Sequence, residues 1–212
     1  MKFFCFGKSI KGKDHLENED NFLIDEKNKL FAVADGVSEP KGGKEASQKI
    51  LKYLKESFKG YLKKAFEEAN EKFLKEKREK FIESYTTLSA VHLKEDFLEA
   101  CNVGDSPILL FRDKKIENLA FIDKLLGTSI LTQAMGEDFI HVHETKKELK
   151  AGDWILLLTD GITDVLSEEE ILKIVEKFVD VEEVCEKIIE EAEKKISFYN
   201  DDKTLIVIKV EK

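Results

Sequence analysis

The sequence predicts an α+β fold, a four-layer α-β-β-α sandwich in which two mainly antiparallel central sheets are flanked by pairs of helices. Segments with strand-like patterning come in runs joined by short connections, and segments with helical spacing come in two pairs. A regular alternation of strand and helix is absent, which argues against a parallel sheet. The segment "TLIVIKV" at 204–210 is apolar on both alternating faces, so we expect a central strand covered on both sides.

Nine segments have the apolar alternation or the short continuous apolar runs that are typical of strands. They span residues 2–6, 21–25, 29–34, 85–92, 96–103, 107–111, 139–144, 154–159 and 203–210. We expect hairpin connections at "KNK", residues 27–29, and at "KED", residues 94–96. Short connections of this kind join antiparallel neighbours.

Apolar residues spaced three and four apart indicate four helices. The first two cover residues 46–54 and 62–73. The third begins at Ser167, where Glu170 completes a capping box, and the fourth covers residues 181–192. These helices form the two pairs that cover the outer faces of the predicted sheets.

Length and charge limit the classes of protein to consider. The chain has 212 residues, 42% of them hydrophobic, so we expect residues 1–212 to form a single domain with a substantial core. The net charge of −9 argues against binding to nucleic acid or to an anionic membrane, because both favour cationic surfaces. We expect a monomer that binds neither nucleic acid nor a membrane.

The three cysteines, Cys5, Cys101 and Cys185, lie far apart and without metal-type spacing. We expect reduced, buried thiols and a cytoplasmic protein. The segment "MKFFCFGKSIKGKD" has too short an apolar stretch for a signal peptide, and no run approaches the length of a membrane span.

Aspartates stand at the ends of five apolar strands. They are Asp20 in "ENEDNF", Asp35 in "VADG", Asp105 in "NVGDSP", Asp160 in "LLTDG" and Asp201 in "YNDDKT". For any one of them, a turn or a helix cap is the simpler interpretation. If the five ends converge, however, the carboxylates repel one another unless cations lie between them. Hard oxygen ligands of this kind suit Mg²⁺ or Mn²⁺.

The same motifs carry a family resemblance. In order they are "NEDNFLID", "FAVADGVSEPKGGKEAS", "YTTLSAVHL", "ACNVGDSPILLF", "LTQAMG", "LKAGDWILLLTDGITDVLSEEEI" and "NDDKTLIVIKV". This set, from about residue 8 to 210, resembles the metal-dependent Ser/Thr protein phosphatases of the 2C type, the PPM family. The resemblance implies that family's central β-sandwich flanked by helices.

The resemblance also implies the metal ligands. Asp35 corresponds to the carboxylate that bridges two ions, and the carbonyl of Gly36 corresponds to a ligand of one of them. Asp160 and Asp201 correspond to ligands of the other ion. The cofactors it implies are therefore two Mn²⁺ or Mg²⁺ ions.

Three more acidic positions match the family. Glu19 and Asp20 resemble the acidic pair that holds metal-bound water. Asp105 matches a position that, together with the equivalent of Asp160, binds a third ion in some members. Whether this chain binds two or three ions stays open at this stage.

The implied function is a protein serine/threonine phosphatase. A hydroxide at the binuclear centre attacks the phosphorus of phosphoserine or phosphothreonine, with Asp35, Asp160 and His15 as the catalytic residues. The implied partner is a phosphorylated protein, with a Ser/Thr kinase as its counterpart. Two alternatives are a phosphatase-like regulatory or binding module of weak or absent activity, and a metal nuclease, which the acidic net charge disfavours.

The sequence departs from the family at two points that bear on phosphate binding. His15 stands where family members commonly have arginine, so it is either a variant phosphate ligand or a solvated loop histidine. The loop after the first Asp-Gly pair lacks the histidine that many relatives carry, which leaves His15, water or Lys41 as the general acid. On a further predicted strand, His141 and His143 share a face, and an exposed strand edge is favoured over a metal pair.

Overall fold

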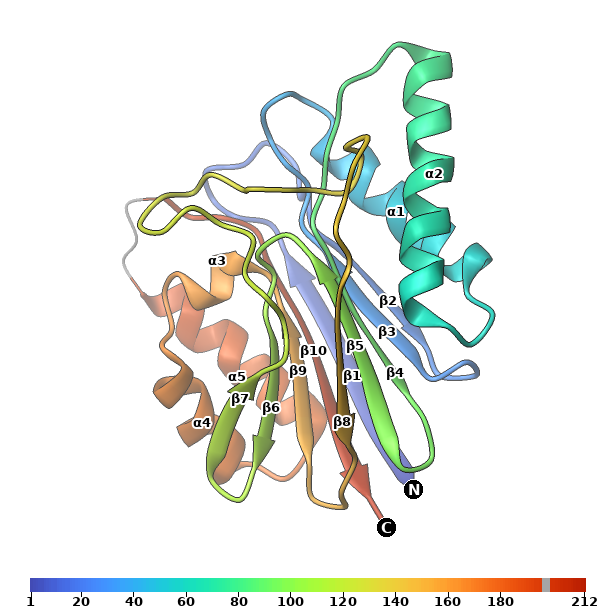
Figure 1. Ribbon diagram of the computed structural model, residues 1–212. Coiled ribbons are helices and arrows are strands. Elements are labelled where there is room, and N and C mark those ends of the chain that lie inside the picture. Colours follow the sequence, from blue (N-terminus) through green and yellow to red (C-terminus); the bar gives the residue numbers. More distant parts are fainter. Residues whose placement is uncertain (196–198) are drawn as a thin grey trace.

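The computed structural model contains two five-stranded antiparallel sheets packed face to face, with helices on both outer sides (Figure 1). It describes residues 1–195 and 199–212. The predicted α+β four-layer sandwich is confirmed. Within the described residues, no helix has both the length and the apolar character needed to cross a membrane.

One sheet has the strand order β1-β10-β9-β6-β7. Its strands are β1 (Lys2–Ile10), β6 (Ile108–Arg112), β7 (Lys115–Asn118), β9 (Trp154–Leu158) and β10 (Lys203–Glu211). The other sheet has the order β2-β3-β4-β5-β8. Its strands are β2 (Asn21–Asp25), β3 (Leu30–Ala34), β4 (Leu88–Leu93), β5 (Phe97–Val103) and β8 (His143–Glu148).

Five helices cover the sandwich. They are α1 (Gly43–Ser57), α2 (Leu62–Lys80), α3 (Asp160–Thr163), α4 (Glu168–Lys177) and α5 (Val181–Lys194). Helices α1 and α2 cover the sheet of β2–β5, whereas α4 and α5 lie on the side of the other sheet (Figure 1). The predicted capping box at the start of α4 is confirmed, because Ser167 and Glu170 each accept a hydrogen bond from the other's backbone N–H.

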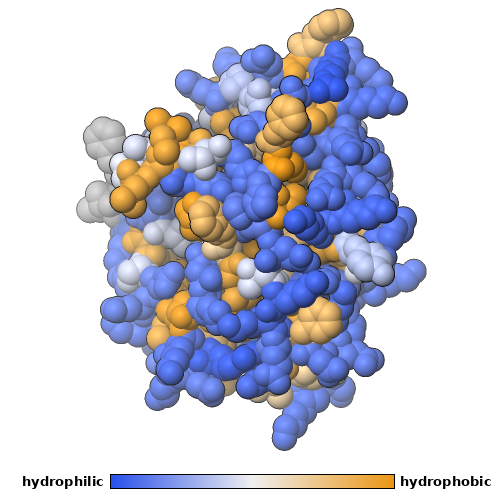
Figure 2. Space-filling view, in the orientation of Figure 1, coloured by the Kyte–Doolittle hydropathy of each residue, from blue (hydrophilic) through white to orange (hydrophobic). Residues whose placement is uncertain are grey.

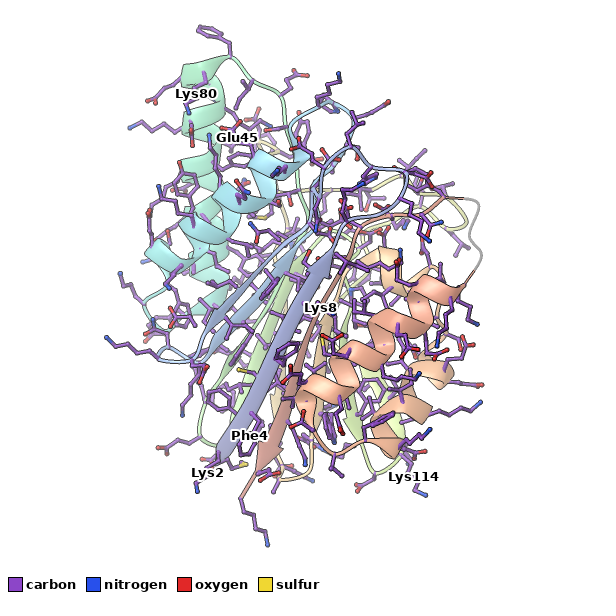
Figure 3. The ribbon with its side chains drawn as sticks, turned by 180° about the vertical axis from the view of Figure 1, so that it is seen from behind. Lys2, Phe4, Lys8, Glu45, Lys80 and Lys114 are labelled. Carbon is purple, nitrogen blue, oxygen red and sulfur yellow. The ribbon has the colours of Figure 1, made fainter. Side chains whose placement is uncertain are left out.

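Three apolar cores fill the three interfaces between the layers. Strand β10 contributes to two of them: Leu205 and Val207 face the helices, and Ile206 and Ile208 face the other sheet. The expectation of a strand covered on both sides is thus confirmed. Seen from behind, β1 runs along the edge beside α5, where Lys8 donates a hydrogen bond to Glu186 (2.7 Å; Figure 3).

The structure corrects two strand boundaries and adds one strand. Strand β1 runs to Ile10, beyond the predicted 2–6, because it pairs with β10 along its full length. The strand predicted at 139–144 is β8, and pairing begins only at His143, which lies opposite Asn102. Strand β7 was not predicted, because "KIEN" is polar and its turn uses two residues with positive φ, Asp113 and Lys114, without a glycine.

Glu76 on α2 fastens the two helices of one layer together. Its carboxylate accepts hydrogen bonds from Lys49 and Tyr53 of α1 and forms an ion pair with Lys80. These three partners lower the pKa of Glu76 to about 2, since each favours the charged form. The side chain is 15% exposed, so solvent screens these interactions less than on an open surface.

We expect Glu76→Gln to lower the free energy of unfolding at pH 7 by about 1 kcal/mol. Because the folded-state pKa lies below the ordinary value, the contribution of Glu76 is complete above about pH 4.5 and is lost as the pH falls towards 2. Urea denaturation at several pH values measures this, with Glu79→Gln, an exposed residue of the same helix, as the control. An equal loss at pH 3 and pH 7 would contradict the prediction.

Candidate metal and active site

The strand-end aspartates gather at one end of the sandwich, the upper end in Figure 1. Asp20 precedes β2 and Asp35 follows β3, and these two strands are antiparallel neighbours. Asp160 follows β9 and Asp201 lies just before β10, which are antiparallel neighbours in the other sheet. In an antiparallel pair, the end of one strand lies beside the start of the next. The topology therefore delivers side chains from both sheets to one place.

A cavity of about 530 Å³ opens at this end of the molecule. Five of the residues that sequence reasoning singled out line it: Asp35, Gly36, Asp105, Asp160 and Asp201. The rest of the wall mixes polar and apolar side chains. It includes Ser38, Pro40, Tyr85, Ile130, Leu131, Ala134 and Tyr199.

Burial and neighbouring charges raise the pKa of three carboxyl groups of this cavity, those of Asp35, Asp105 and Asp201. Burial raises the pKa of Asp35 well above its usual range, and the charges of Asp20, Asp160, Asp201 and Asp105 raise it further. Burial and the charge of Asp160 raise the pKa of Asp201 to about 6, and the same two causes raise the pKa of Asp105 to about 6. Crowded carboxylates of this kind are stabilised as anions only by cations placed among them.

Glu19 and Asp20 are not among the residues that line the cavity within the described part of the chain. Asp20 is 7% exposed and accepts a hydrogen bond from the Thr159 hydroxyl (2.8 Å). Glu19 accepts a hydrogen bond from the Ser38 hydroxyl. The pair therefore stands at the edge of the site, close enough that Asp20 affects the pKa of Asp35.

Each Asp-Gly pair uses its glycine for close backbone packing. A Cβ on Gly36 would lie 2.3 Å from the carbonyl group of Gly43, where α1 begins. A Cβ on Gly161 would lie 1.9 Å from the carbonyl oxygen of Asp202. The second contact holds the start of α3 against the residue before β10, which brings Asp160 and Asp201 together.

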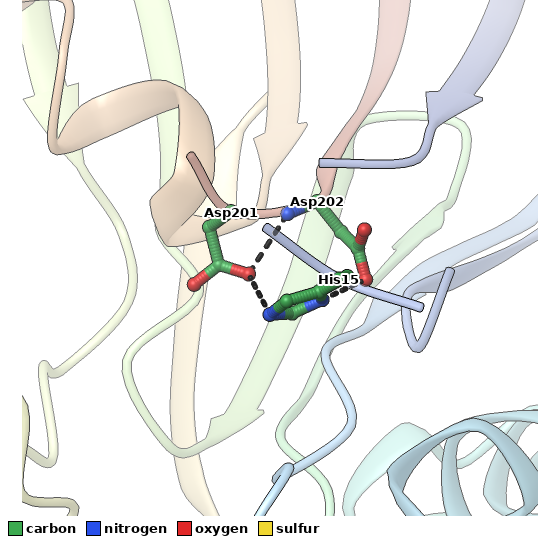
Figure 4. A group of neighbouring side chains, drawn as sticks. All are labelled: His15, Asp201 and Asp202. Atoms are coloured by element: carbon green, nitrogen blue, oxygen red, sulfur yellow. Dashed lines mark hydrogen bonds and ion pairs between the residues drawn. The ribbon is translucent and has the colours of Figure 1, made fainter. Parts of the chain in front are cut away.

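His15 lies in a cluster with Asp201 and Asp202 (Figure 4). Its Nδ1 is 2.8 Å from Asp202 Oδ2, its Nε2 is 3.3 Å from Asp201 Oδ1, and the Tyr199 hydroxyl also contacts Nε2. Burial lowers the pKa of His15, but the hydrogen bond and charge of Asp202, with the charges of Asp201 and Glu19, leave it raised. Both ring nitrogens are thus engaged within the protein, and a role in phosphate binding stays a prediction.

Among the described residues, this cluster is the one set of three potential metal ligands whose ligand atoms lie within 4.8 Å of one another. Asp202, however, also accepts hydrogen bonds from the backbone N–H groups of Gly12 and Glu19, both at 2.7 Å. Its carboxylate, 2% exposed, is therefore satisfied by protein donors and fastens the loop from Gly12 to Glu19 to the start of β10. The sequence showed only an acidic residue beside Asp201, because the partners of Asp202 are nearly two hundred residues away.

Lys124 is a site residue that sequence reasoning missed. Its Nζ lies 2.9 Å from Asp105 Oδ2 and 2.9 Å from Asp160 Oδ2. Burial lowers the pKa of Lys124, but the two carboxylates raise it and leave the ammonium charged. No sequence motif indicated Lys124 as a site residue, because the segment between β7 and β8 has neither strand nor helix periodicity.

The two histidines predicted to share a strand face differ in their surroundings. His143 Nε2 lies 2.9 Å from Asp123 Oδ1, whereas His141 is exposed and stacks edge-on against His143 (4.8 Å between ring centroids). Asp123 belongs to the segment that carries Lys124. His143 thus supports one wall of the site by a hydrogen bond with Asp123.

Three solved structures of Ser/Thr phosphatases have a fold similar to that of this chain. The Mycobacterium tuberculosis phosphatase PstP/Ppp superimposes with a TM-score of 0.89 at 23% identity, with 99% of each chain covered. The PstP catalytic domain with two manganese ions gives a TM-score of 0.87 at 24% identity, again with 99% of each chain covered. Stp1 from Staphylococcus aureus gives 0.88 at 20% identity, covering all of this chain and 96% of the other. At such identities the likeness establishes the fold, which is the PPM phosphatase fold.

Residues 44–211 match the sequence profile of the family described as Stage II sporulation protein E (SpoIIE). The chain belongs to this family. The serine/threonine protein phosphatase PstP of Mycobacterium tuberculosis is 26% identical over 211 residues, which cover 86% of this chain. The chain spans about 40% of the length of that curated relative.

We expect Gly161→Ala to lower the free energy of unfolding by about 3 kcal/mol, because the new Cβ meets a backbone oxygen that cannot rotate away. Gly60→Ala is the matched control. There the added Cβ meets nothing within 4 Å, and only the φ of +90° costs about 1 kcal/mol. Urea denaturation of both variants checks this, and equal losses would show that the close approach to Asp202 does not constrain the site.

Proposed function

We propose that this chain is a metal-dependent protein phosphatase that hydrolyses phosphoserine and phosphothreonine monoesters at a pair of divalent cations. The observation that carries the proposal is the convergence of Asp35, Asp105, Asp160 and Asp201 from distant parts of the chain on one cavity. The family membership and the two manganese ions of the PstP catalytic domain support it.

The donor set fits hard divalent cations. Among the described residues, the carboxylate of Asp35 accepts no hydrogen bond from the protein, so its oxygens are available to ions. Asp35, the carbonyl of Gly36, Asp160 and Asp201 are the groups that would hold the two ions. All the donors are oxygen atoms, which Mn²⁺ and Mg²⁺ prefer.

The surrounding acidic residues have supporting roles in the proposal. Glu19 and Asp20 hold water beside the ions, and Asp105 borders the cavity next to Asp160. When bound, two divalent cations lower the pKa of an attacking water and neutralise charge on the phosphoryl oxygens. The protein's own task is to hold the carboxylates in place and to seat the phosphorylated side chain.

The cavity wall has the features that such a substrate requires. Tyr85, Ile130 and Leu131 give an apolar wall against which the alkyl part of a phosphorylated residue can pack. In the same segment as Ile130 and Leu131, Leu126 is fully exposed, and Leu125 and Ile130 are about half exposed. Figure 2 shows apolar side chains gathered on the surface of this part of the molecule, the segment between β7 and β8. These side chains offer a contact surface for the residues that flank the phosphate.

The proposed partner is a phosphorylated protein, with a Ser/Thr kinase as the enzyme that opposes this one. Both are inferred from relatives whose names describe serine/threonine protein phosphatases. The net charge of −9 disfavours nucleic acid as a partner. We further propose that residues 1–212 form one phosphatase domain, that it is monomeric and that it acts in the cytoplasm.

A second candidate is a module that binds metal and phosphoprotein without turnover. The engagement of His15 with Asp201 and Asp202 favours it, because the residue at the expected phosphate-binding position already has partners. Activity measurements separate the two candidates. A phosphatase turns over a phosphopeptide when Mn²⁺ is added, whereas such a module binds the ions and leaves the peptide intact.

We expect hydrolysis of an aryl phosphate and of a phosphothreonine peptide to require added Mn²⁺ or Mg²⁺. Asp35→Asn and Asp160→Asn should each reduce the rate by at least about 100-fold, because each removes a charged ligand. Asp113→Asn is the control, since Asp113 is exposed on the β6–β7 turn and asparagine tolerates its positive φ. Metal-dependent turnover that persists in both site variants would refute the proposed function.

A further inference from the structure

We infer that the ammonium group of Lys124 occupies the place between Asp105 and Asp160, so that this chain binds two divalent cations and not three. The inference rests on the proposed function, because it concerns the same acidic site. The positive charge of Lys124 neutralises Asp105 and Asp160, which a third divalent cation would otherwise do. The inference also gives Lys124 a positioning role towards Asp160.

The contacts of Lys124 are specific. Its Nζ is 2.9 Å from one oxygen of Asp105 and 2.9 Å from one oxygen of Asp160. The Lys124 side chain is 17% exposed, and the Asp105 side chain is 5% exposed. A second cavity is lined by Lys124, Asp105, Asp160 and a third carboxyl group, that of Asp164. Burial and the charge of Asp160 raise the pKa of Asp164, and the charge of Lys124 lowers it. One ammonium thus contacts two carboxylates, that of the buried Asp105 and that of Asp160, and the exposed Asp164 lies beside them.

The backbone on either side holds Lys124 in this place. The N–H of Asp123 donates to the carbonyl of Gly104 (3.1 Å), and the N–H of Gly104 donates to Asp123 Oδ2 (3.0 Å). These bonds tie the residue before Lys124 to the residue before Asp105. On its other side, Lys124 forms an isolated antiparallel bridge with Leu131. These contacts place the backbone of Lys124 beside Asp105, so that its side chain can reach both carboxylates.

Lys124 and an ion in this position exclude each other. An ion that bridges Asp105 and Asp160 must lie between the oxygen atoms that Nζ already contacts. Moving the ammonium away would break its contacts with both carboxylates and leave the buried Asp105 without its cation, which is unfavourable. The contact also holds Asp160 by Oδ2 alone. Asp160 Oδ1 is left for the two divalent cations of the proposed centre, so Lys124 orients this ligand.

Counting bound Mn²⁺ tests the inference without relying on activity. Calorimetry and elemental analysis after equilibrium dialysis should give two ions per wild-type chain, up to millimolar Mn²⁺. Lys124→Arg keeps the charge and should also give two. Lys124→Met removes the charge and frees the position between two carboxylates, so it should give three. Lys75→Met, a change at an exposed lysine on α2, is the matched control and should give two.

Each result supports or overturns the inference. Three ions in the wild type would overturn it and leave the proposed function standing. Two ions in both the wild type and Lys124→Met, with unchanged affinities, would also overturn it. No bound ion in the wild type would overturn the proposed function and, with it, the inference. If Lys124→Met does not fold by circular dichroism, Lys124→Gln takes its place, and the wild-type count tests the inference by itself.

Discussion

Mutual repulsion among carboxylates is the constraint on which this structure depends. Asp35, Asp105, Asp160 and Asp201 share one cavity, where burial and the charge of Asp160 raise the pKa of the other three. A flexible chain would relieve that repulsion by moving apart. Here the four residues are attached to the ends of strands in two sheets that are packed face to face over an apolar core. The stability of that packing holds the four charges close together.

The loops at this end of the sandwich are fastened by contacts that do not take part in the proposed chemistry. Gly161 allows α3 to touch the carbonyl of Asp202, and the Asp202 side chain holds the loop from Gly12 to Glu19. His15 joins this set through Asp202. The proposed ligands are thus separated from the residues that position them, although Asp201 and Asp202 are adjacent in sequence.

Sequence reasoning located most of the strands and the aspartates that line the cavity, because both depend on local patterns. The apolar runs that end in Asp35 and Asp160, and the doubly apolar strand after Asp201, were all recognisable from short windows. Lys124 and the clamping role of Asp202 were not. Each acts through partners far away in the chain, and nothing in the neighbouring residues sets a salt-bridged lysine apart from a solvated one. Strand β7 was missed for a related reason, since its pairing with β6 determines its conformation.

The two-sided burial of β10 ties the site to the whole molecule. Asp201 precedes the strand whose side chains enter two cores at once, and β10 lies between β1 and β9 in its sheet. Segments buried in this way exchange their amide hydrogens only when the protein unfolds globally. Strand β10 therefore does not unfold separately from the rest of the chain. Ions bound to Asp201 would stabilise the entire chain against denaturation.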